Sequence, residues 1–204
     1  MVTSHPESAS FNFALADAAE RTFRENGVSL RHTRLYQDGF AIAPGRSDFE
    51  AFPETLPLRL MDAQRHSEAH GGFVLSLRQE QEALVWADLL MLQFPVWWGS
   101  YPAALKGWIE RVLAYGFAYG REKTLPPKAV VLSVTTGGAN TDRERAEYVE
   151  RLDSLADDVF GYMGWRVHPH LIAHGPARAT DEARRDMLRE HRSGVRALVK
   201  ERTI

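Results

Sequence analysis

The sequence of 204 residues contains no cysteine. This absence excludes disulfide bonds, thiolate nucleophiles and zinc sites that are built from thiolates. No block of basic residues occurs and the formal net charge is only −2, so neither nucleic acid nor an anionic membrane surface is expected as a partner. No apolar run approaches the roughly 20 residues of a membrane-spanning helix. The N-terminal MVTSHPESAS also lacks the charged-then-apolar pattern of a signal peptide, so we expect a cytoplasmic protein without an integral membrane segment.

Strand-like and helix-like segments alternate along the chain, which predicts one domain, residues 1–204, with a parallel sheet between two layers of helices. The expected strands are residues 1–4, 28–36, 87–94, 129–135 and 165–172. The expected helices are residues 12–26, 59–70, 76–86 and 141–163, with one more that begins near Pro102 and a last one from Thr180. The strands at 87–94 and 129–135 are uninterrupted apolar runs, which is typical of central strands buried on both faces. The fifth strand is broken by Pro169 and is expected at an edge.

Two other segments carry local signals. Residues 37–72 are rich in proline, glycine and charge, which indicates a long excursion from the sheet around one short helix. TDRE predicts a capping box in which Thr141 accepts the N–H of Glu144. The helix that follows should bury one stripe of apolar side chains, namely Val149, Leu152, Ala156, Val159, Phe160 and Met163.

In open α/β sheets, ligands bind outside the carboxyl ends of the strands, so the segments after the first, third and fourth strands are the candidate site. The first, SHPESASFN, offers serine hydroxyls and His5, and it leads into a helix N-terminus that favours an anion. A phosphate site without glycine is one interpretation. The other is an ordinary serine cap next to a surface histidine.

The second segment, PVWWGSYP, brings two adjacent tryptophans into a loop. Trp97 and Trp98 cannot both enter the core easily, and a flat ligand that stacks on indole would explain one of them. Gly99 would let such a ligand approach the backbone closely. Trp108 differs, because it lies on the apolar stripe of the next helix and is expected in the core.

The third segment, TTGGAN, can present consecutive backbone N–H groups from Gly137 and Gly138. Together the three segments supply phosphate donors, an aromatic wall and N–H donors. A flavin nucleotide needs these three features for its phosphate, its ring and the polar edge of that ring.

The stretches HPESASFN, ADLLMLQFPVWWGSYPAALKGWIERVLAYGFAYG and LSVTTGG resemble the NAD(P)H:quinone oxidoreductase family, which includes bacterial quinone reductases and ancillary flavoproteins of potassium-efflux systems. The resemblance covers about His5 to Gly175. It implies a flavodoxin-like three-layer α/β/α fold with a five-stranded parallel sheet in the order 2-1-3-4-5. It also implies a homodimer that uses FAD, or alternatively FMN, to pass hydride from NAD(P)H to a quinone.

The resemblance assigns roles position by position. Residues that match contacts to the flavin diphosphate and nucleotide are His5, Ser10, Phe11 and Asn12. Residues that match the loop along the flavin ring are Pro95, Val96, Trp97, Trp98 and Gly99. Residues that match the loop at the pyrimidine edge are Thr135, Thr136, Gly137 and Gly138. Tyr119 and Trp98 are the expected catalytic walls of the acceptor pocket, and Gln64 matches a contact near the adenosine.

Some features depart from the family or allow other interpretations. The first strand is unusually short, and Tyr148 stands at a different spacing from the tyrosine of the animal enzymes, so it is assigned no role. His168, His170 and His174 are interpreted as a solvated strand face and no metal site is expected, because no acidic ligand is set beside them. A flavin-bearing regulatory subunit of a membrane transporter is the main alternative, and a one-electron carrier is a third.

Overall fold

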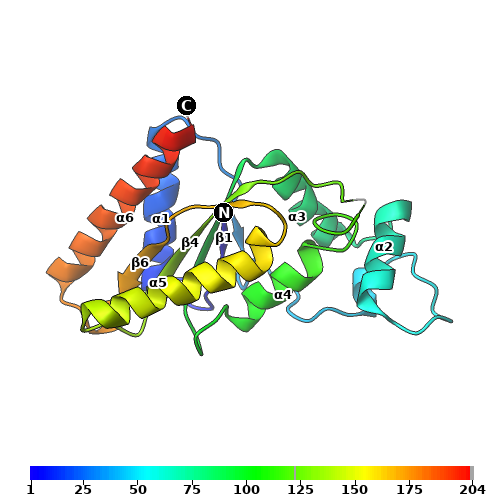
Figure 1. Cartoon of the computed structure of the whole chain (residues 1–204), viewed down its shortest axis with the longest axis horizontal. Coiled ribbons are helices and arrows are strands. Elements are labelled where there is room, and N and C mark those ends of the chain that lie inside the picture. The colour runs from blue at the N-terminus through cyan, green and yellow to red at the C-terminus, as the bar shows by residue number, and fades with distance from the viewer. Residues whose placement is uncertain (122, 203–204) are drawn as a thin grey trace.

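The computed structural model describes residues 1–121 and 123–202 and shows strands that alternate with helices (Figure 1). The strands are β1 (Val2–Thr3), β2 (Thr33–Arg34), β3 (Leu89–Pro95), β4 (Ala129–Thr136), β5 (Arg166–Val167) and β6 (Leu171–His174). All pairs among them are parallel, and their order is β2-β1-β3-β4-β5, with β6 also paired to β4. The predicted order is confirmed, and the predicted fifth strand is divided in two around Pro169.

Helices cover both faces of this sheet (Figure 1). They are α1 (Phe11–Glu25), α2 (Leu60–His70), α3 (Leu75–Trp86), α4 (Ala103–Val112), α5 (Asp142–Ala156) and α6 (Asp181–Arg202). One cluster of buried side chains joins α3, α4 and α5 to one face of the sheet, and Trp108 belongs to it as expected. A second cluster joins α1 and α6 to the opposite face. The structure is therefore the predicted three-layer α/β/α arrangement.

β3 and β4 form the centre of the sheet and pair over seven residues of β3, from Leu89 to Pro95. Apart from the first residue of each, all of their residues are buried. Successive side chains enter opposite clusters, since Leu92 packs on the α4 side and Met91 on the α1 side. The expectation of strands buried on both faces is confirmed.

The prediction of a strand over residues 28–36 is largely wrong, because only Thr33–Arg34 of this segment is paired. Its neighbour β1 has two residues, Val2–Thr3, and can offer only two partners in the ladder. Alternation of apolar and polar residues is present along the whole segment, but a strand also needs a partner to bind its backbone.

α5 begins at a capping box and is extended at its end by a π-helical turn. The predicted capping box is confirmed, since Oγ1 of Thr141 accepts the N–H of Glu144 at 3.1 Å and the Glu144 carboxylate accepts the N–H of Thr141 at 3.3 Å. Val149, predicted to be buried, is 43% exposed, because only the second half of α5 reaches the core. A π-helical turn, Asp157–Gly161, then extends the helix and buries Phe160.

The excursion over residues 37–72 is fixed to α4. Nη2 of Arg111 lies 2.7 Å from Oδ1 of Asp48, and both side chains are almost fully buried. A Cβ added to Gly107 would lie 1.7 Å from the carbonyl oxygen of Ile42, so only glycine lets the excursion approach α4 this closely. The excursion is therefore anchored to α4 at these two places, although most of its residues are exposed.

Gln64 of α2 also serves this attachment. Its side chain is buried, its Nε2 donates to the carbonyl of Glu110 at 3.0 Å, and its Oε1 accepts the N–H of Tyr115 at 3.0 Å. Both ends of the amide are therefore used inside the protein, which leaves neither for the adenosine contact that the resemblance implies.

A chain of hydrogen bonds between buried side chains crosses the sheet, and we call it the buried polar chain. Nδ2 of Asn12 donates to Oγ1 of Thr135 at 2.9 Å, and Nε2 of Gln93 donates to Oδ1 of Asn12 at 2.9 Å. Oγ of Ser133 donates to Oε1 of Gln93 at 2.6 Å and lies 2.9 Å from Nε2 of His191. All five side chains are buried, and they link α1, β3, β4 and α6.

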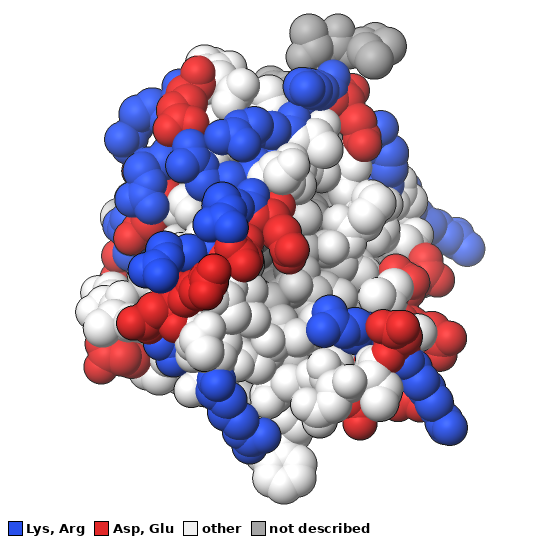
Figure 2. Space-filling view, turned by 90° about the vertical axis from the view of Figure 1, so that its left-hand side faces the viewer, with Lys and Arg blue, Asp and Glu red and all other residues white. Residues whose placement is uncertain are grey.

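The exposed faces of α1 and α6 carry interspersed basic and acidic side chains (Figure 2). Arg192 of α6 pairs with Glu25 of α1 at 2.8 Å, and Arg24 pairs with Glu20 at 2.8 Å. Such exposed pairs contribute little to stability. Over the described ranges, no helix combines the length and the apolar character that crossing a bilayer requires.

Replacing Gln93 by leucine tests the buried polar chain. The substitution would leave Oδ1 of Asn12 buried without a donor and would leave Oγ of Ser133 with His191 alone, so we expect the free energy of unfolding to fall by about 2–4 kcal/mol. Chemical denaturation measures this loss. Gln81→Leu is the matched control, because Gln81 is also buried but makes a single 3.4 Å contact with the carbonyl of Val112. Equal losses in the two variants would contradict the assigned role.

The pH dependence of stability tests the same chain at His191. Burial lowers the pKa of His191 from 6.5 to about 4. The unfolded chain therefore takes up a proton near pH 6.5 and the folded chain only near pH 4, so the stability from neutral His191 is present above pH 6.5 and is lost as the pH falls towards 4. The full effect is on the order of 3 kcal/mol.

We expect the free energy of unfolding to fall less steeply between pH 6.5 and pH 4 in His191→Gln than in the wild type. His70→Gln, at an exposed position, should follow the wild-type curve. Denaturation at a series of pH values provides the comparison, and parallel curves for all three proteins would show that His191 does not govern this pH range.

Candidate active site

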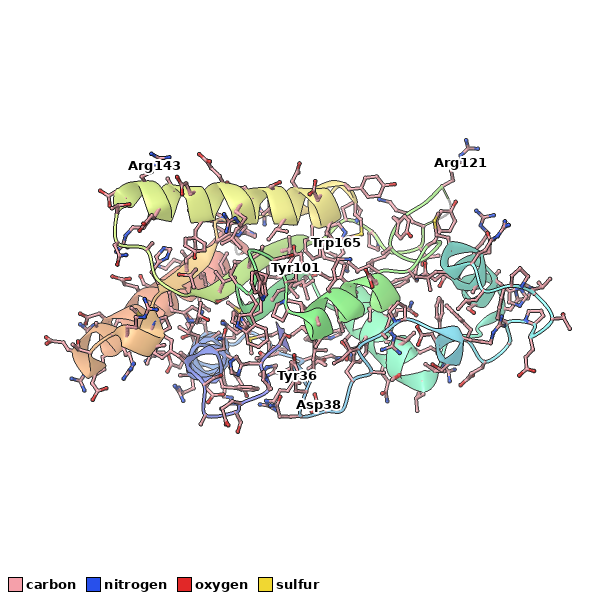
Figure 3. The ribbon with its side chains drawn as sticks, turned by 90° about the horizontal axis from the view of Figure 1, so that it is seen from below. Tyr36, Asp38, Tyr101, Arg121, Arg143 and Trp165 are labelled. Carbon is pink, nitrogen blue, oxygen red and sulfur yellow. The ribbon has the colours of Figure 1, made fainter. Side chains whose placement is uncertain are left out.

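Three strands end side by side at one edge of the sheet, which is the lower edge in Figure 1 and faces the viewer in Figure 3. Three segments leave the sheet there, and we call residues 4–10, 96–101 and 137–141 the first, second and third edge loops. The strand order reverses between β1 and β3, and ligands of open α/β sheets bind at such a reversal. The edge loops therefore form the candidate active site.

The first edge loop leads into the N-terminus of α1. The hydroxyl of Ser10 caps the helix, and Nδ1 of His5 accepts the N–H of Glu7 at 3.0 Å. The carboxylate of Glu7 accepts another backbone N–H of the same loop at 2.9 Å. The N–H groups of Phe11 and Asn12 open the helix, where no intrahelical partner exists, and together with the helix dipole they favour an anion such as phosphate.

The buried polar chain fixes how the first and third edge loops start. Its hydrogen bond between Asn12 and Thr135 occupies the Asn12 side chain, so only the backbone N–H of this residue remains for a ligand. The strand expected over residues 87–94 extends one residue further, since Pro95 is the last residue of β3 and lies opposite Thr135. The N–H of Val96 continues this pairing, since it donates to the carbonyl of Thr135 at 2.8 Å.

The second edge loop contains a tight turn with an unusual residue. The backbones of Trp97 and Ser100 exchange two hydrogen bonds, of 3.2 and 3.0 Å, around the central residues Trp98 and Gly99. These central residues have φ of 49° and 73°, which is the geometry of a type I′ turn, where Asn-Gly is preferred. A bulky side chain is strained in this conformation.

The two tryptophans of this turn both face solvent. Trp98 is fully exposed, and Trp97 is 41% exposed with its ring centroid 5.8 Å from that of His5. The fold thus holds an indole in a strained backbone without packing it against the rest of the chain. The turn displays aromatic surface beside the first edge loop.

Tyr101 fixes the far end of the second edge loop. Its ring lies between α4 and α5 in Figure 3, and its hydroxyl donates to the carbonyl of Leu155 at 2.8 Å. The ring also packs 5.3 Å from Phe94 of β3. The turn of the second edge loop is therefore attached to the sheet at one end and to α5 at the other.

The third edge loop contains two glycines that differ in kind. Gly138 has φ of 134°, which requires glycine, and its N–H donates to Oγ1 of Thr136 at 3.3 Å. Gly137 does not have a positive φ, and a Cβ added to it would meet no atom within 4 Å. The fold does not need glycine at position 137, so its bare backbone is available for close approach by a ligand.

Three side chains that were not assigned to the site from the sequence lie beside it. Nδ1 of His174 lies 3.1 Å from Oγ1 of Thr136, and the His174 ring is 5.6 Å from that of Tyr148. Burial, and then Arg145, lower the pKa of His174. Arg151 of α5 reaches the turn, since a Cβ on Gly99 would lie 3.3 Å from its guanidinium. The signal for His174 was its position at the end of a strand that neighbours the fourth strand, because the other edge residues also stand at or after strand ends.

His168 and His170 were predicted to form a solvated face, and this prediction is wrong. The His168 side chain is 5% exposed with Nδ1 3.1 Å from the Glu201 carboxylate, and the His170 side chain is 2% exposed with Nε2 3.1 Å from Asp153. α6 and α5 supply these partners and cover β5 and β6. Burial lowers the pKa of both histidines. In the part of the chain that the structure describes, no three potential metal ligands gather.

Tyr119 and Trp98, predicted to line one pocket, are not neighbours within the chain. Trp98 precedes α4 and Tyr119 follows it, and the ten residues of α4 separate its ends by about 15 Å. The Tyr119 ring packs instead 5.4 Å from Tyr115 and 6.2 Å from Tyr162. Burial, with these two tyrosines, raises the pKa of Tyr119.

The chain is similar to known proteins in sequence and in structure. The profile of the flavodoxin-like fold family matches residues 1–195. The chain belongs to this family. The flavodoxin-like protein is 29% identical to the Mus musculus ribosyldihydronicotinamide dehydrogenase (quinone), over 100% of this chain and 93% of that protein. It is 34% identical to the Rattus norvegicus NAD(P)H dehydrogenase (quinone) 1, over 69% of this chain and 54% of that protein.

A solved structure resembles this flavodoxin-like protein over most of its length. It is a Klebsiella pneumoniae protein named as a quinone reductase, with a TM-score of 0.85 and 29% identity, covering 97% of this chain and 83% of that chain. The curated relatives with 34% identity are matched over only 54% to 57% of their own lengths.

Trp98→Asn tests the strain in the turn. Asparagine is favoured at positive φ and Trp98 makes no buried contact, so we expect the free energy of unfolding to rise by about 1 kcal/mol. Trp98→Ala removes the same ring but keeps a disfavoured conformation, and it should leave stability almost unchanged. Thermal and chemical denaturation compare the three proteins. A destabilised asparagine variant would mean that the ring supports the fold after all.

Proposed function

We propose that this flavodoxin-like protein is a flavin-dependent oxidoreductase that takes hydride from NAD(P)H and reduces a quinone. The observation that carries the proposal is the meeting of three features at one sheet edge. These are the anion-favouring start of α1, an indole that the fold does not pack, and the bare backbone at Gly137. A flavin nucleotide has an anionic phosphate, a flat ring and a polar ring edge that accepts N–H donors.

We assign the edge residues to three parts of the flavin. Those proposed to hold the phosphate end are His5, Ser10, Phe11 and Asn12. Those proposed to border the ring are Pro95, Val96, Trp97, Trp98 and Gly99. Those proposed at the polar edge of the ring are Thr135, Thr136, Gly137 and Gly138, whose N–H groups would stabilise negative charge there. The bound flavin would supply the hydride chemistry, while the chain supplies binding, orientation and exclusion of water.

We also propose that two copies complete the acceptor pocket as a homodimer. Trp98 precedes α4 and Tyr119 follows it, which supports a pocket that Trp98 of one copy and Tyr119 of the other border together. A two-fold axis would bring the Tyr119 end of α4 in one copy to the Trp98 end in the other. Two large side chains on or just after α5 are exposed in the single chain, Tyr162 at 74% and Val149 at 43%. Their exposure supports the proposal that a second copy covers this surface.

FAD is the proposed flavin, with FMN as the alternative, and the cytoplasm is the proposed location. The packing of Gln64 removes one adenosine contact that the resemblance implies, so the choice of flavin rests on the remaining resemblance. The mass of the chromophore released from the purified protein distinguishes the two flavins directly.

The proposed function is tested by loading the purified protein with FAD or FMN and measuring oxidation of NADH and NADPH with menadione as acceptor. We expect a yellow protein that turns over repeatedly with at least one donor. A fully loaded protein without turnover would reject the enzyme and favour the regulatory-subunit alternative. A protein that binds neither flavin would reject both.

Gly137→Ala makes this test specific to the site. The added methyl meets open space in the chain, so the melting temperature without flavin should stay within about 1 °C of wild type, while the flavin Kd should rise by about tenfold or more. Gly45→Ala is the matched control, because its Cβ would make only an ordinary 3.8 Å contact far from the edge loops. An unchanged Kd in Gly137→Ala would remove the third edge loop from the site.

A further inference from the structure

The hydrogen bonds of the buried polar chain have a direction as well as a position. His191 of α6 stands at one end of the chain, and Thr135, near the end of β4, stands at the other. α1 and α6 lie side by side on one face of the sheet, and both helices contribute to the chain (Figure 1). The proposed function gives His191 no role. Whether it influences the candidate active site depends on which atoms donate between the two ends.

Ser133 fixes which ring nitrogen of His191 carries the proton. The Ser133 hydroxyl has a single proton, and it donates this proton to Oε1 of Gln93 at 2.6 Å. Towards His191, Oγ of Ser133 can therefore only accept, and Nε2 of His191 lies 2.9 Å away. Burial lowers the pKa of His191 to about 4, so the ring carries one N–H at neutral pH. That N–H is on Nε2, which leaves Nδ1 as an unprotonated acceptor.

The two amides of the chain continue the same direction. Nε2 of Gln93 donates to Oδ1 of Asn12 at 2.9 Å, and Nδ2 of Asn12 donates to Oγ1 of Thr135 at 2.9 Å. Each amide accepts at its oxygen or is followed by a donor at its nitrogen, so the order of donation is kept from one residue to the next. Aligned hydrogen bonds also polarise and strengthen one another. Donation therefore proceeds from His191 to Thr135 without interruption.

Thr135 has an unused proton at the end of the chain. Its Oγ1 accepts from Asn12, and among the residues that the structure describes none accepts the proton of the Thr135 hydroxyl. Because Asn12 is the second residue of α1, this hydroxyl lies near the N–H groups that open the helix. A ligand atom that meets Thr135 must then be an acceptor, as phosphate oxygens and the polar edge of a flavin ring are.

The opposite direction of donation would place the proton of His191 on Nδ1 and turn both amides. Nδ1 of His191 is buried and has no hydrogen-bond partner within the described part of the chain. The reversed chain would thus bury an N–H without an acceptor, which is rarer in folded proteins than a buried acceptor without a donor. Thr135 would also donate its proton to Asn12 and offer only lone pairs to a ligand. Donation from His191 to Thr135 is therefore favoured.

We propose that His191 is a positioning residue that fixes Thr135 as a hydrogen-bond donor to the flavin, although α6 lies outside the edge loops. This inference rests on the proposed function and adds to it a determinant of ligand choice. The three side chains between the two ends transmit the direction, because each one donates to the next. The site therefore selects ligand atoms that accept at Thr135 and rejects those that donate there.

Nuclear magnetic resonance of nitrogen-15-labelled protein without flavin tests the direction itself. Long-range correlations between ring protons and ring nitrogens show which nitrogen of a histidine is protonated, and the signal that is lost in His191→Gln identifies His191. At neutral pH we expect the proton on Nε2. A proton on Nδ1 would mean that donation proceeds the other way, and it would overturn the inference whether or not the protein binds flavin.

The flavin Kd tests whether the direction affects the ligand. His191→Leu removes the donor to Ser133, so the Kd should rise by about tenfold. His191→Gln places an amide N–H near the position of Nε2 and should keep the Kd within about twofold of wild type. Thr135→Val removes the last donor, and Thr135→Ser is its matched control because it keeps the hydroxyl. In the Thr135→Val background, His191→Leu should change the Kd no further.

Two results would overturn the inference in these variants. One is an equal rise of the Kd in His191→Leu and His191→Gln, and the other is a full tenfold rise from His191→Leu in the Thr135→Val background. Either would show that His191 affects the site through stability alone. A wild-type protein that binds neither flavin although His191 is protonated on Nε2 would instead reject the proposed function, and with it the flavin as the acceptor.

Discussion

The buried polar chain from Thr135 to His191 is the interaction that holds the parts of this fold in one relative position. Apolar packing alone is not directional, whereas buried hydrogen bonds must be satisfied in one geometry. Asn12 stands at the start of α1 and Thr135 near the end of β4, so their hydrogen bond sets where the first and third edge loops begin. Ser133 and His191 extend the same constraint to α6.

The centre of the fold could be predicted from the sequence because its signals are local. Unbroken apolar runs identify β3 and β4, and the TDRE box identifies the start of α5. The failures share a different cause. The pairing of residues 28–36 depends on the length of β1, and the burial of His168 and His170 depends on helices that cross β5 and β6. Such relations join distant segments, and no local pattern encodes them.

In the candidate site, too, the features with local sequence signals could be predicted and those that join distant segments could not. Its three edge loops follow from the positions of the strand ends, and the structure brings His5, Trp97 and Asn12 with Thr135 together at one edge. The position of His174 beside Thr136 was missed, because the sequence does not show which face of a split edge strand is covered. The separation of Trp98 from Tyr119 follows from the length of α4, a distance that residue types cannot reveal.

The strain at Trp98 and the bare backbone at Gly137 both favour a binding site at this edge of the sheet. In both places the chain departs from what stability would favour or require, and both places lie at the same edge. Local choices that conflict with folding are most often found where a protein meets another molecule.

The attachment of residues 37–72 to α4 limits how this long segment can move. Displacing it from α4 would separate the buried pair of Arg111 and Asp48 and the close contact of Gly107 with Ile42. Leaving either charge buried without its partner is costly, so a swing of the whole segment away from α4 is disfavoured.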